Sequence, residues 1–335
     1  MNSKIFGKLS DGREVKLYTI TGGTSFASIT DYGATITAFR PFGDRDIIGG
    51  YDELSMYEMD NSNQGATIGR VANRIEDAEF TMDGAIYMLP ANNNGNCLHG
   101  GIGFKRKIWD VLEHTENSIL LSCFSPDGDD GFPSDLVTKV RFTLIDATLV
   151  ISYEAIPGGK TPIALTNHSY FNLEGFGGDV KDHLITIFAE KYTEVDERLI
   201  PTGSRPSVEG TPFDLRTPKK IGADFCESFG GYDHNFFLSP REYKEFLGEK
   251  VGLGAIVKAG GYSMSFYTDQ PGVQLYTANF LGGEPDFRGG IKRIPHGAFC
   301  LEAQTEPNCV KHGEGFYEAG EVYRQTTVYE LKREA

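Results

Sequence analysis

Histidine and carboxylate side chains stand in several segments where they could transfer protons. His99 precedes two glycines, His168 precedes Ser-Tyr-Phe, His234 follows Asp233, and Glu302 interrupts an apolar segment. An imidazole titrates near neutrality, so it can give and retake a proton at pH 7. Burial disfavours the charged form of a carboxylate, which makes a glutamate in an apolar strand a stronger base. These residues therefore predict general acid–base chemistry.

Each of these residues also has a purely structural interpretation. Glu302 could form a core ion pair with Arg74, and His168 could be a core histidine whose ring nitrogens are satisfied. The other structural interpretations are His99 as a turn residue, Asp233 as a strand-end cap, Gln274 bonded to strand backbone, and Asn73-Arg74 paired at the surface with Glu76 or Asp77.

The remaining histidines and the cysteines carry no metal or disulfide signal. We interpret His114, His183, His296 and His312 as surface or loop residues, and we expect no metal site because no H-x-x-x-H or H-x-H spacing occurs. The five cysteines are odd in number and lack a C-x-x-C spacing, which argues against a disulfide framework. With no apolar segment typical of a signal peptide or membrane helix, we expect a cytoplasmic protein.

Period-2 alternation predicts that strands position these side chains. Lys139–Leu144 alternates apolar with polar residues, and a turn leads into a second apolar strand at Leu149–Ile156. Further strands are expected at Val15–Ile20, Leu184–Ala189, Tyr262–Tyr267, Gly272–Phe280, Phe299–Ala303 and Gln325–Leu331. Short helices are expected at Asp52–Met59 and from Ser239 through Phe246, where Ser-Pro-Arg-Glu has capping-box spacing. Many strands and few helices predict an all-β sandwich, in one domain over residues 1–335.

The charge balance limits the classes of partner. Lys and Arg number 32 against 47 Asp and Glu, for a net charge of −15. Such a protein repels phosphate backbones and anionic lipid, so we expect no nucleic-acid or membrane partner, whereas a neutral small molecule is compatible. The basic cluster Lys105-Arg106-Lys107, close to Trp109, is interpreted as a solvated edge.

Residues 166–173, TNHSYFNL, resemble the signature of the aldose 1-epimerases, also called galactose mutarotases. Five further segments resemble the same family in the same order: GRVANRI at 69–75, LHGG at 98–101, YDHN at 232–235, QPGVQLYT at 270–277 and CLEAQ at 300–304. The tail from 319 to 329 also fits. The resemblance covers nearly the whole chain. Six segments in family order are hard to obtain by chance, so the structural interpretations, taken together, are disfavoured.

The resemblance implies a β-supersandwich that interconverts the α and β anomers of free aldohexoses such as galactose and glucose, without a cofactor. It implies that Glu302 is the general base, His168 the general acid, and His99 a second histidine near the ring oxygen of the sugar. The residues implied to bind or surround the sugar are Asn73, Arg74, Asp233, Gln274, Tyr170 and Tyr276. We expect a monomer or a homodimer.

The implied chemistry suits these residue types. Opening a pyranose removes the proton from O1 and protonates the ring oxygen, so a base and an acid must act together. Two other functions stay open. One is a non-catalytic carbohydrate-binding protein on the same fold, motivated by an aromatic content of 12%. The other is a hexose-6-phosphate mutarotase, which the acidic charge disfavours.

Overall fold

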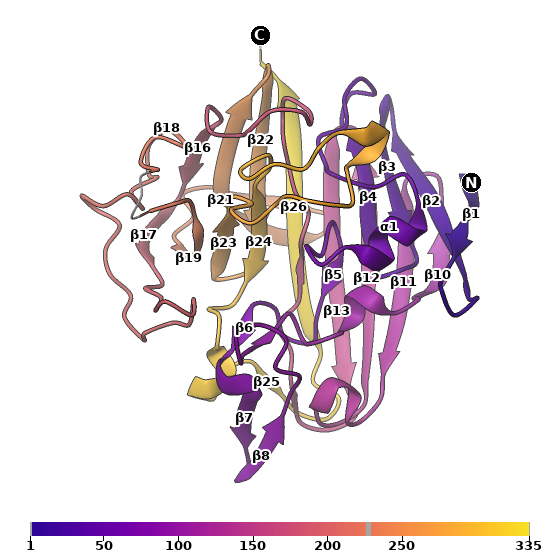
Figure 1. The fold of residues 1–335 in the computed structure, drawn as a ribbon, viewed down its shortest axis with the longest axis vertical. Helices are drawn as coiled ribbons and strands as arrows, with labels where there is room; N and C mark the ends of the chain where they lie inside the picture. The colour runs from indigo at the N-terminus through magenta and orange to yellow at the C-terminus, as the bar shows by residue number, and fades with distance from the viewer. Residues whose placement is uncertain (1, 226–228, 335) are drawn as a thin grey trace.

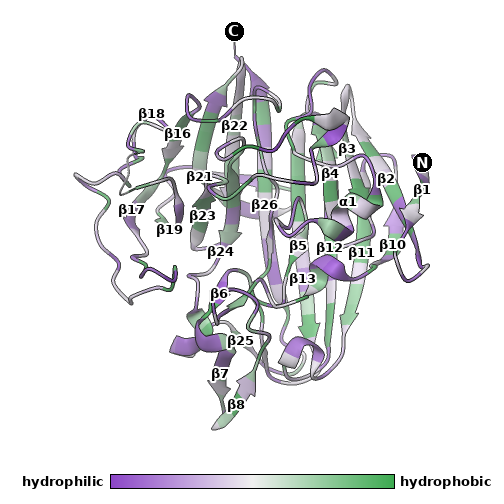
Figure 2. Ribbon diagram, in the orientation of Figure 1, coloured by the Kyte–Doolittle hydropathy of each residue, from purple (hydrophilic) through white to green (hydrophobic). Residues whose placement is uncertain are grey.

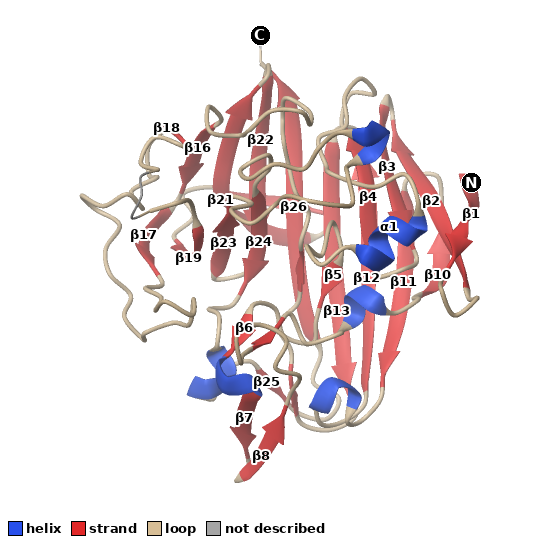
Figure 3. Ribbon diagram, in the orientation of Figure 1, coloured by secondary structure: helices blue, strands red, loops and turns tan. Residues whose placement is uncertain are grey.

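A computed structural model describes residues 2–225 and 229–334 of the chain, so Cys226 lies outside the described residues. Strands form nearly all of the regular structure, arranged as one large antiparallel sheet and two four-stranded sheets (Figures 1 and 3). The predicted all-β sandwich is confirmed.

The large sheet has ten strands. In spatial order they are β10 (Asp110–His114), β11 (Ser118–Ser125), β12 (Leu136–Ile145), β13 (Thr148–Pro157), β26 (Tyr323–Arg333), β22 (Tyr262–Thr268), β21 (Glu249–Ala259), β16 (Leu184–Ile187) and β18 (Lys219–Lys220), while β20 (Tyr243–Phe246) also pairs with β21. The C-terminal strand β26 lies in the middle, so the two halves of the chain share one sheet.

Two four-stranded sheets complete the sandwich. The first is β1 (Asn2–Lys8), β2 (Glu14–Gly22), β3 (Ser25–Thr30) and β4 (Thr35–Arg40), beside β11 and β12. The second is β17 (Ala189–Tyr192), β19 (Asp233–Leu238), β23 (Gly272–Tyr276) and β24 (Cys300–Gln304), in that spatial order. The strand predicted at Gly272–Phe280 therefore ends four residues early.

Short elements connect these sheets. Two-strand pairs are β5 (Thr67–Ile68) with β15 (Thr166–Asn167), β6 (Arg74–Ile75) with β9 (Cys97–Leu98), β7 (Glu79–Met82) with β8 (Ala85–Met88), and β14 (Thr161–Pro162) with β25 (Phe316–Tyr317). The predicted helix near Asp52–Met59 is α1 (Leu54–Met59), and single 3₁₀ turns occur at Glu76–Ala78, Phe104–Arg106, Asp129–Gly131, Arg288–Gly290 and Cys309–His312. Within the described ranges, no helix is long and apolar enough to cross a bilayer.

Alternation along the strands builds the core. In β12, Val140, Phe142 and Leu144 are fully buried while Lys139 and Arg141 are only half-buried, because successive side chains point to opposite faces. Figure 2 shows this alternation of apolar and polar residues along several strands. One buried apolar cluster includes residues of all three large sheets, from Tyr18 to Leu331.

The helix predicted from Ser239 through Phe246 is wrong. Tyr243–Phe246 is strand β20, which pairs with β21 from Phe246 opposite Glu249. The two loop residues, Leu247 and Gly248, both have positive φ, at 54° and 87°. A two-residue loop with positive φ matches the twist of the strands on either side of it and so favours a β-hairpin. The hairpin forms here in spite of the capping-box sequence, which favours a helix.

The surroundings of His183 and of the basic cluster differ from those expected. His183 lies in the loop before β16, but it is fully buried and accepts a hydrogen bond from the Leu173 backbone N–H, at 3.1 Å, so it is not a surface histidine. His114 and His296 are half-buried beside carbonyl oxygens, while His312 is exposed as expected. The basic cluster is not a solvated edge: Arg106 donates to the carbonyls of Tyr57 and Glu58, and Lys107 pairs with Asp129 at 2.6 Å.

A buried arginine, Arg70, connects several loops through hydrogen bonds. Arg70 is 2% exposed, and its guanidinium donates to the hydroxyl and carbonyl of Ser125, the carbonyls of Pro126 and Pro133, and the hydroxyl of Thr161. Most of these acceptors are buried and depend on donors within the protein, whereas the Pro126 carbonyl also accepts from the Asp129 N–H. Arg70 precedes Asn73 and Arg74 by only a few residues, so it also fixes the segment that carries them.

We expect Arg70→Met to lower the free energy of unfolding by about 3–5 kcal/mol, because it leaves several buried acceptors unpaired. Urea denaturation followed by tryptophan fluorescence and circular dichroism measures this change. The matched control is Arg141→Met on β12, where a part-exposed side chain pairs with Glu113, and we expect a loss of only about 0.5 kcal/mol. Equal losses in the two variants would refute the role given to Arg70.

Candidate active site

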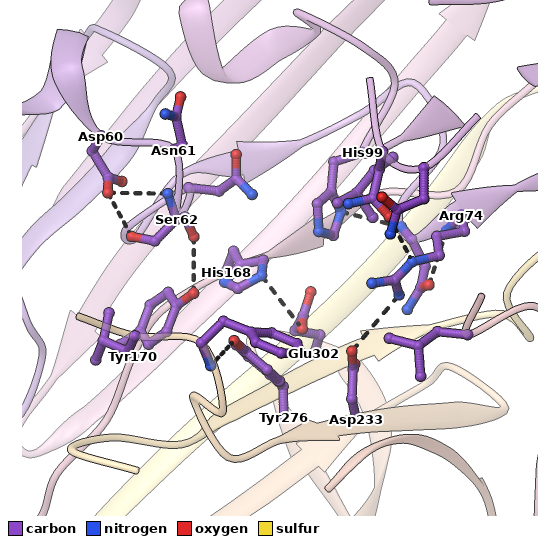
Figure 4. A pocket seen from close by; sticks show the side chains of 18 of the residues that line it. Asp60, Asn61, Ser62, Arg74, His99, His168, Tyr170, Asp233, Tyr276 and Glu302 are labelled. Carbon is purple, nitrogen blue, oxygen red and sulfur yellow. Dashed lines mark hydrogen bonds and ion pairs between the residues drawn. The ribbon is translucent and has the colours of Figure 1, made fainter. Parts of the chain in front are cut away.

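A cavity of about 630 Å³ opens over the second four-stranded sheet (Figure 4). Its volume is within the range of about 300–1,000 Å³ that small-molecule sites occupy. Of the nine site residues predicted from sequence, eight line it: Asn73, Arg74, His99, His168, Tyr170, Asp233, Tyr276 and Glu302. Gln274 is not among the lining residues.

The register of three strands places one set of these side chains on a single face. Asp233 of β19 is opposite Tyr276 of β23, which is opposite Cys300 of β24. One step along, Gln274 is opposite Glu302. Residues two apart in a strand, and residues directly opposite in neighbouring strands, point to the same face. The apolar partners Leu301 and Ala303 face the core instead, which explains why Glu302 stands in an apolar segment.

His168 is held over this face by backbone pairing on both sides. Its N–H donates to the Ala66 carbonyl, and its own carbonyl accepts from Gly65, as an extension of the β15–β5 pair. Three residues later, Phe171 exchanges two backbone hydrogen bonds with Phe299, directly before β24. The result places His168 Nε2 3.8 Å from Oε1 of Glu302. Figure 4 marks this contact with a dashed line.

His99 has a fixed protonation pattern. It lies in a turn with φ of 56°, as the turn interpretation expected, yet its ring also faces the cavity. The Asn73 backbone N–H donates to His99 Nδ1, at 3.2 Å. Since Nδ1 is the acceptor, the proton of the neutral ring is on Nε2. Burial, and then the neighbouring His168, lower the pKa of His99 well below its usual range, so the ring is a neutral donor.

Burial acts in opposite directions on Glu302 and His168. Glu302 is 2% exposed, and burial raises the pKa of its carboxyl well above the usual range; Asp233 raises it further and Arg74 opposes this. Its Oε2 has no hydrogen-bond partner among the described residues. Burial lowers the pKa of His168 to about 4, against a smaller raising effect of its own carbonyl. The core ion pair between Glu302 and Arg74 is not formed.

Arg74 instead pairs with Asp233 across the cavity. The distance from Arg74 Nη1 to Asp233 Oδ2 is 3.7 Å, and Arg74 Nε also donates to Asn93 Oδ1 at 3.1 Å. Gln274 donates to Asp233 Oδ1 at 2.7 Å, so it supports Asp233 from behind. This contact, and not a bond to strand backbone, explains its polar side chain. The surface pairing suggested for Glu76 and Asp77 is made by Arg198.

Two tyrosines enclose the imidazole of His168. The ring of Tyr170 stacks against it with centroids 5.1 Å apart, and Tyr276 meets it edge-on at 6.2 Å. The Tyr170 hydroxyl donates to the Ser62 carbonyl, and the Tyr276 hydroxyl accepts from the Phe280 N–H. Both tyrosines therefore connect the sheet face to the loops that form the rim of the cavity.

Sequence reasoning missed the wall of the cavity made by two loops. Asp60 and Arg293, both buried, form an ion pair at 2.9 Å, and Arg293 also donates to the Tyr51 hydroxyl. Phe280 lines the rim and is 79% exposed. A signal did exist, since DNSNQ at 60–64 is an uninterrupted polar run directly after the helix predicted at Asp52–Met59. The pairing of Asp60 with Arg293, 233 positions away, could not be predicted, because no local sequence pattern indicates it.

The cavity also contains a set of atoms that metals accept as ligands. One donor atom from each of His99, His168 and Glu302 lies within 4.8 Å of the others. With Nδ1 of His99 already bonded to the Asn73 N–H, its Nε2 is the atom that remains available. The absence of a resident metal therefore stays a prediction, which activity in the presence of a chelator tests.

Comparisons with known proteins agree on one family. A model of the family described as aldose 1-epimerase matches residues 16–330. The chain is 40% identical to a galactose mutarotase from Rattus norvegicus, covering 98% of this chain and 97% of that protein, and 33% identical to an aldose 1-epimerase from Escherichia coli, covering 96% of each. A solved aldose epimerase homologue from C. elegans superposes with a TM-score of 0.86 at 26% identity, over 95% of this chain and 99% of that one. A galactose 1-epimerase structure from Lactobacillus acidophilus has a TM-score of 0.87 at 24% identity, over 100% and 99%.

The charges around Glu302 predict how its pKa responds to substitution. Asp233→Asn removes a negative charge and is expected to lower the pKa of Glu302, whereas Arg74→Gln removes a positive charge and is expected to raise it. Carbon-13 NMR of glutamate-labelled protein, with Glu302→Gln to assign the signal, measures both shifts. A wild-type Glu302 signal that titrates at the ordinary pKa of a surface glutamate would contradict the burial argument.

Proposed function

The chain belongs to the aldose 1-epimerase family, and on this premise we propose that it interconverts the anomers of free aldohexoses such as galactose and glucose. It is an isomerase, and its family acts on sugars. One observation carries the assignment of roles: a buried carboxylate with an unbonded oxygen lies beside a buried imidazole, both facing a cavity lined with polar side chains.

Glu302 and His168 share one proton in this proposal. When the proton is on His168, Glu302 is ionised and the pair is ready to react; when it is on Glu302, both groups are neutral. The opposed pKa shifts favour the neutral arrangement in the empty site. Hydroxyl groups of a bound sugar donate to the carboxylate, and this favours the reactive arrangement.

Ring opening then runs as one balanced exchange. The Glu302 carboxylate removes the proton from O1, and the C1–O1 bond becomes a carbonyl. The C1–O5 bond breaks with its electron pair on the ring oxygen, which takes the Nε2 proton of His168. Rotation about C1–C2 presents the other face of the aldehyde, and the reverse transfers close the ring to the other anomer.

The remaining polar residues hold the sugar while this happens. Asp233 and Arg74 can accept from and donate to its hydroxyls, and Asn73 lies beside them. His99 donates its Nε2 proton towards the ring oxygen, where negative charge develops during opening. Gln274 contributes by holding Asp233 in place. These contacts keep the open chain from leaving or turning over before the ring closes.

A sugar phosphate fits this cavity poorly. The cationic side chains that line it, within the described residues, are Arg74, Arg198 and Arg293. Arg74 pairs with Asp233, Arg198 with Glu76 and Asp77, and Arg293 with Asp60. A dianionic phosphate would need to displace one of these pairs. A purely binding protein would have no use for the unbonded oxygen of Glu302, because leaving it unpaired costs stability.

Domain organisation, location and assembly are further parts of this proposal. We infer a single domain because one core cluster includes residues from Tyr18 to Leu331. A cytoplasmic location is supported by Cys97, Cys123, Cys300 and Cys309, which are free thiols. The net charge of −15 supports the absence of nucleic-acid and anionic-membrane partners. The choice between monomer and homodimer stays a prediction for sedimentation measurements.

Polarimetry of freshly dissolved α-D-galactose and α-D-glucose tests the activity. We expect the wild type to accelerate the change in rotation, and Glu302→Gln and His168→Asn each to lower kcat by about 10²- to 10⁴-fold. Glu113→Gln and His312→Asn are matched controls at exposed positions and are expected to retain full activity. Activity with glucose 6-phosphate but not with free sugars would replace this proposal by the phosphate one, and sugar binding without turnover would favour the binding protein. A chelator is expected to leave the rate unchanged.

The shared proton predicts a bell-shaped dependence of kcat/KM on pH. On the acid side the pair takes up a second proton at His168, whose pKa lies at about 4. On the alkaline side the pair loses its only proton, at a pH set by the raised pKa of Glu302. Initial rates between pH 3 and 11, corrected for the uncatalysed reaction, measure both limbs. A rate that stays constant at high pH would show that no shared proton is needed.

A further inference from the structure

The two histidines in the cavity differ in what lies against Nδ1. The Asn73 backbone N–H donates to Nδ1 of His99, at 3.2 Å. Against Nδ1 of His168 lies the sulfur of Cys300, at 3.6 Å. A backbone N–H can only donate, whereas a thiol sulfur is also a weak acceptor. Of the two rings, only that of His168 has a neighbour that can keep a proton on Nδ1.

We propose that Cys300 is a positioning residue for His168: its sulfur accepts the Nδ1–H hydrogen bond, so that Nε2 alone exchanges the proton with the sugar. The inference rests on the acid role proposed for His168 and extends it to a residue that does not line the cavity. When the protonated ring gives its Nε2 proton to the ring oxygen, the Nδ1 proton remains, and the lone pair on Nε2 can take the proton back.

Strand β24 gives this arrangement its geometry. Cys300 and Glu302 are two residues apart, so both side chains lie on the face that carries the cavity. One rigid strand therefore supplies the base and the group that orients the acid. Cys300 has no exposed surface, and burial raises the pKa of its thiol well above the usual range, so it remains a neutral thiol beside the imidazole.

Among the described residues, Cys300 provides the side chain that lies against Nδ1 of His168. The titratable groups around the ring are Glu302 and Cys300 from β24, Tyr276 from β23, Tyr170 from its own segment and His99 from the turn after β9, with Asp60 and Lys105 as more distant charges. The hydroxyl of Tyr170 is committed to the Ser62 carbonyl, and that of Tyr276 accepts from Phe280. Glu302 faces Nε2, which leaves the Nδ1 side to the sulfur and to the carbonyl of His168 itself.

The test combines Cys300→Ala and Cys300→Ser with Cys123→Ala, which removes another buried thiol from β11, outside the cavity. Loss of the acceptor destabilises the protonated imidazole, so we expect Cys300→Ala to lower kcat about tenfold with little change in KM, and to move the acid limb of the pH profile to lower pH. Serine, whose hydroxyl also accepts, is expected to restore both. Cys123→Ala is expected to match the wild type.

Nitrogen-15 NMR of the histidine rings gives a readout that does not depend on turnover. Above the acid limb, the wild-type ring of His168 is expected to carry its proton on Nδ1, and the Cys300→Ala ring to show a mixture of the two forms. A wild-type proton on Nε2 would overturn the proposal, as would a Cys300→Ala variant with unchanged kcat and acid limb. Full activity of Glu302→Gln or His168→Asn would instead refute the proposed function and leave the ring measurement valid. Should Cys300→Ala fail to fold, the wild-type measurement and the serine variant still decide the question.

Discussion

Removal of water from one carboxylate and one imidazole is the constraint on which this site depends. In water the carboxyl has the lower pKa, so a proton shared by glutamate and histidine stays on the imidazole and the two groups form an ion pair. The two charged groups would then interact with each other in preference to a substrate. Burial reverses the order by raising the pKa of Glu302 and lowering that of His168. Either group can then hold the proton, and a bound molecule with hydroxyl groups decides which one does.

The scaffold meets this constraint by dividing the work between strands and loops. The Glu302 carboxylate and the Cys300 thiol are on strand β24, and the Gln274 amide that supports Asp233 is on β23, where register fixes their direction. The imidazole comes from an irregular segment that is bonded to strands on both sides. The cationic side chains at the rim, the exposed Arg198 and the buried Arg293, are bound to carboxylates or carbonyls. The field at Glu302 is therefore set mainly by Asp233 and Arg74.

The sequence predicted the parts of the molecule that repeat or match a known pattern. Period-2 alternation located strands such as β12 and β26, and six ordered segments identified eight of the residues around the cavity. Features that depend on tertiary contacts escaped. A two-residue loop with positive φ at Leu247 and Gly248 changed an expected helix into a strand. The burial of His183, the carbonyl bonds of Arg106 and the pair of Asp60 with Arg293 each depend on segments distant in sequence, which no local pattern encodes.

The placement of Glu302, the proposed base, on a strand has a consequence for how such an enzyme can diverge. A strand whose register shifts by one residue presents its other face. A one-residue shift of β24 would therefore turn Leu301 and Ala303 towards the cavity in place of Cys300 and Glu302. A strand has no register between these two, so the proposed acid–base chemistry is either kept or lost in a single step. The rim has no such restriction, because residues 60–63 and 280–284 belong to loops, which accept changes of length. New sugar preferences can therefore evolve gradually at the rim while the strands below remain unchanged.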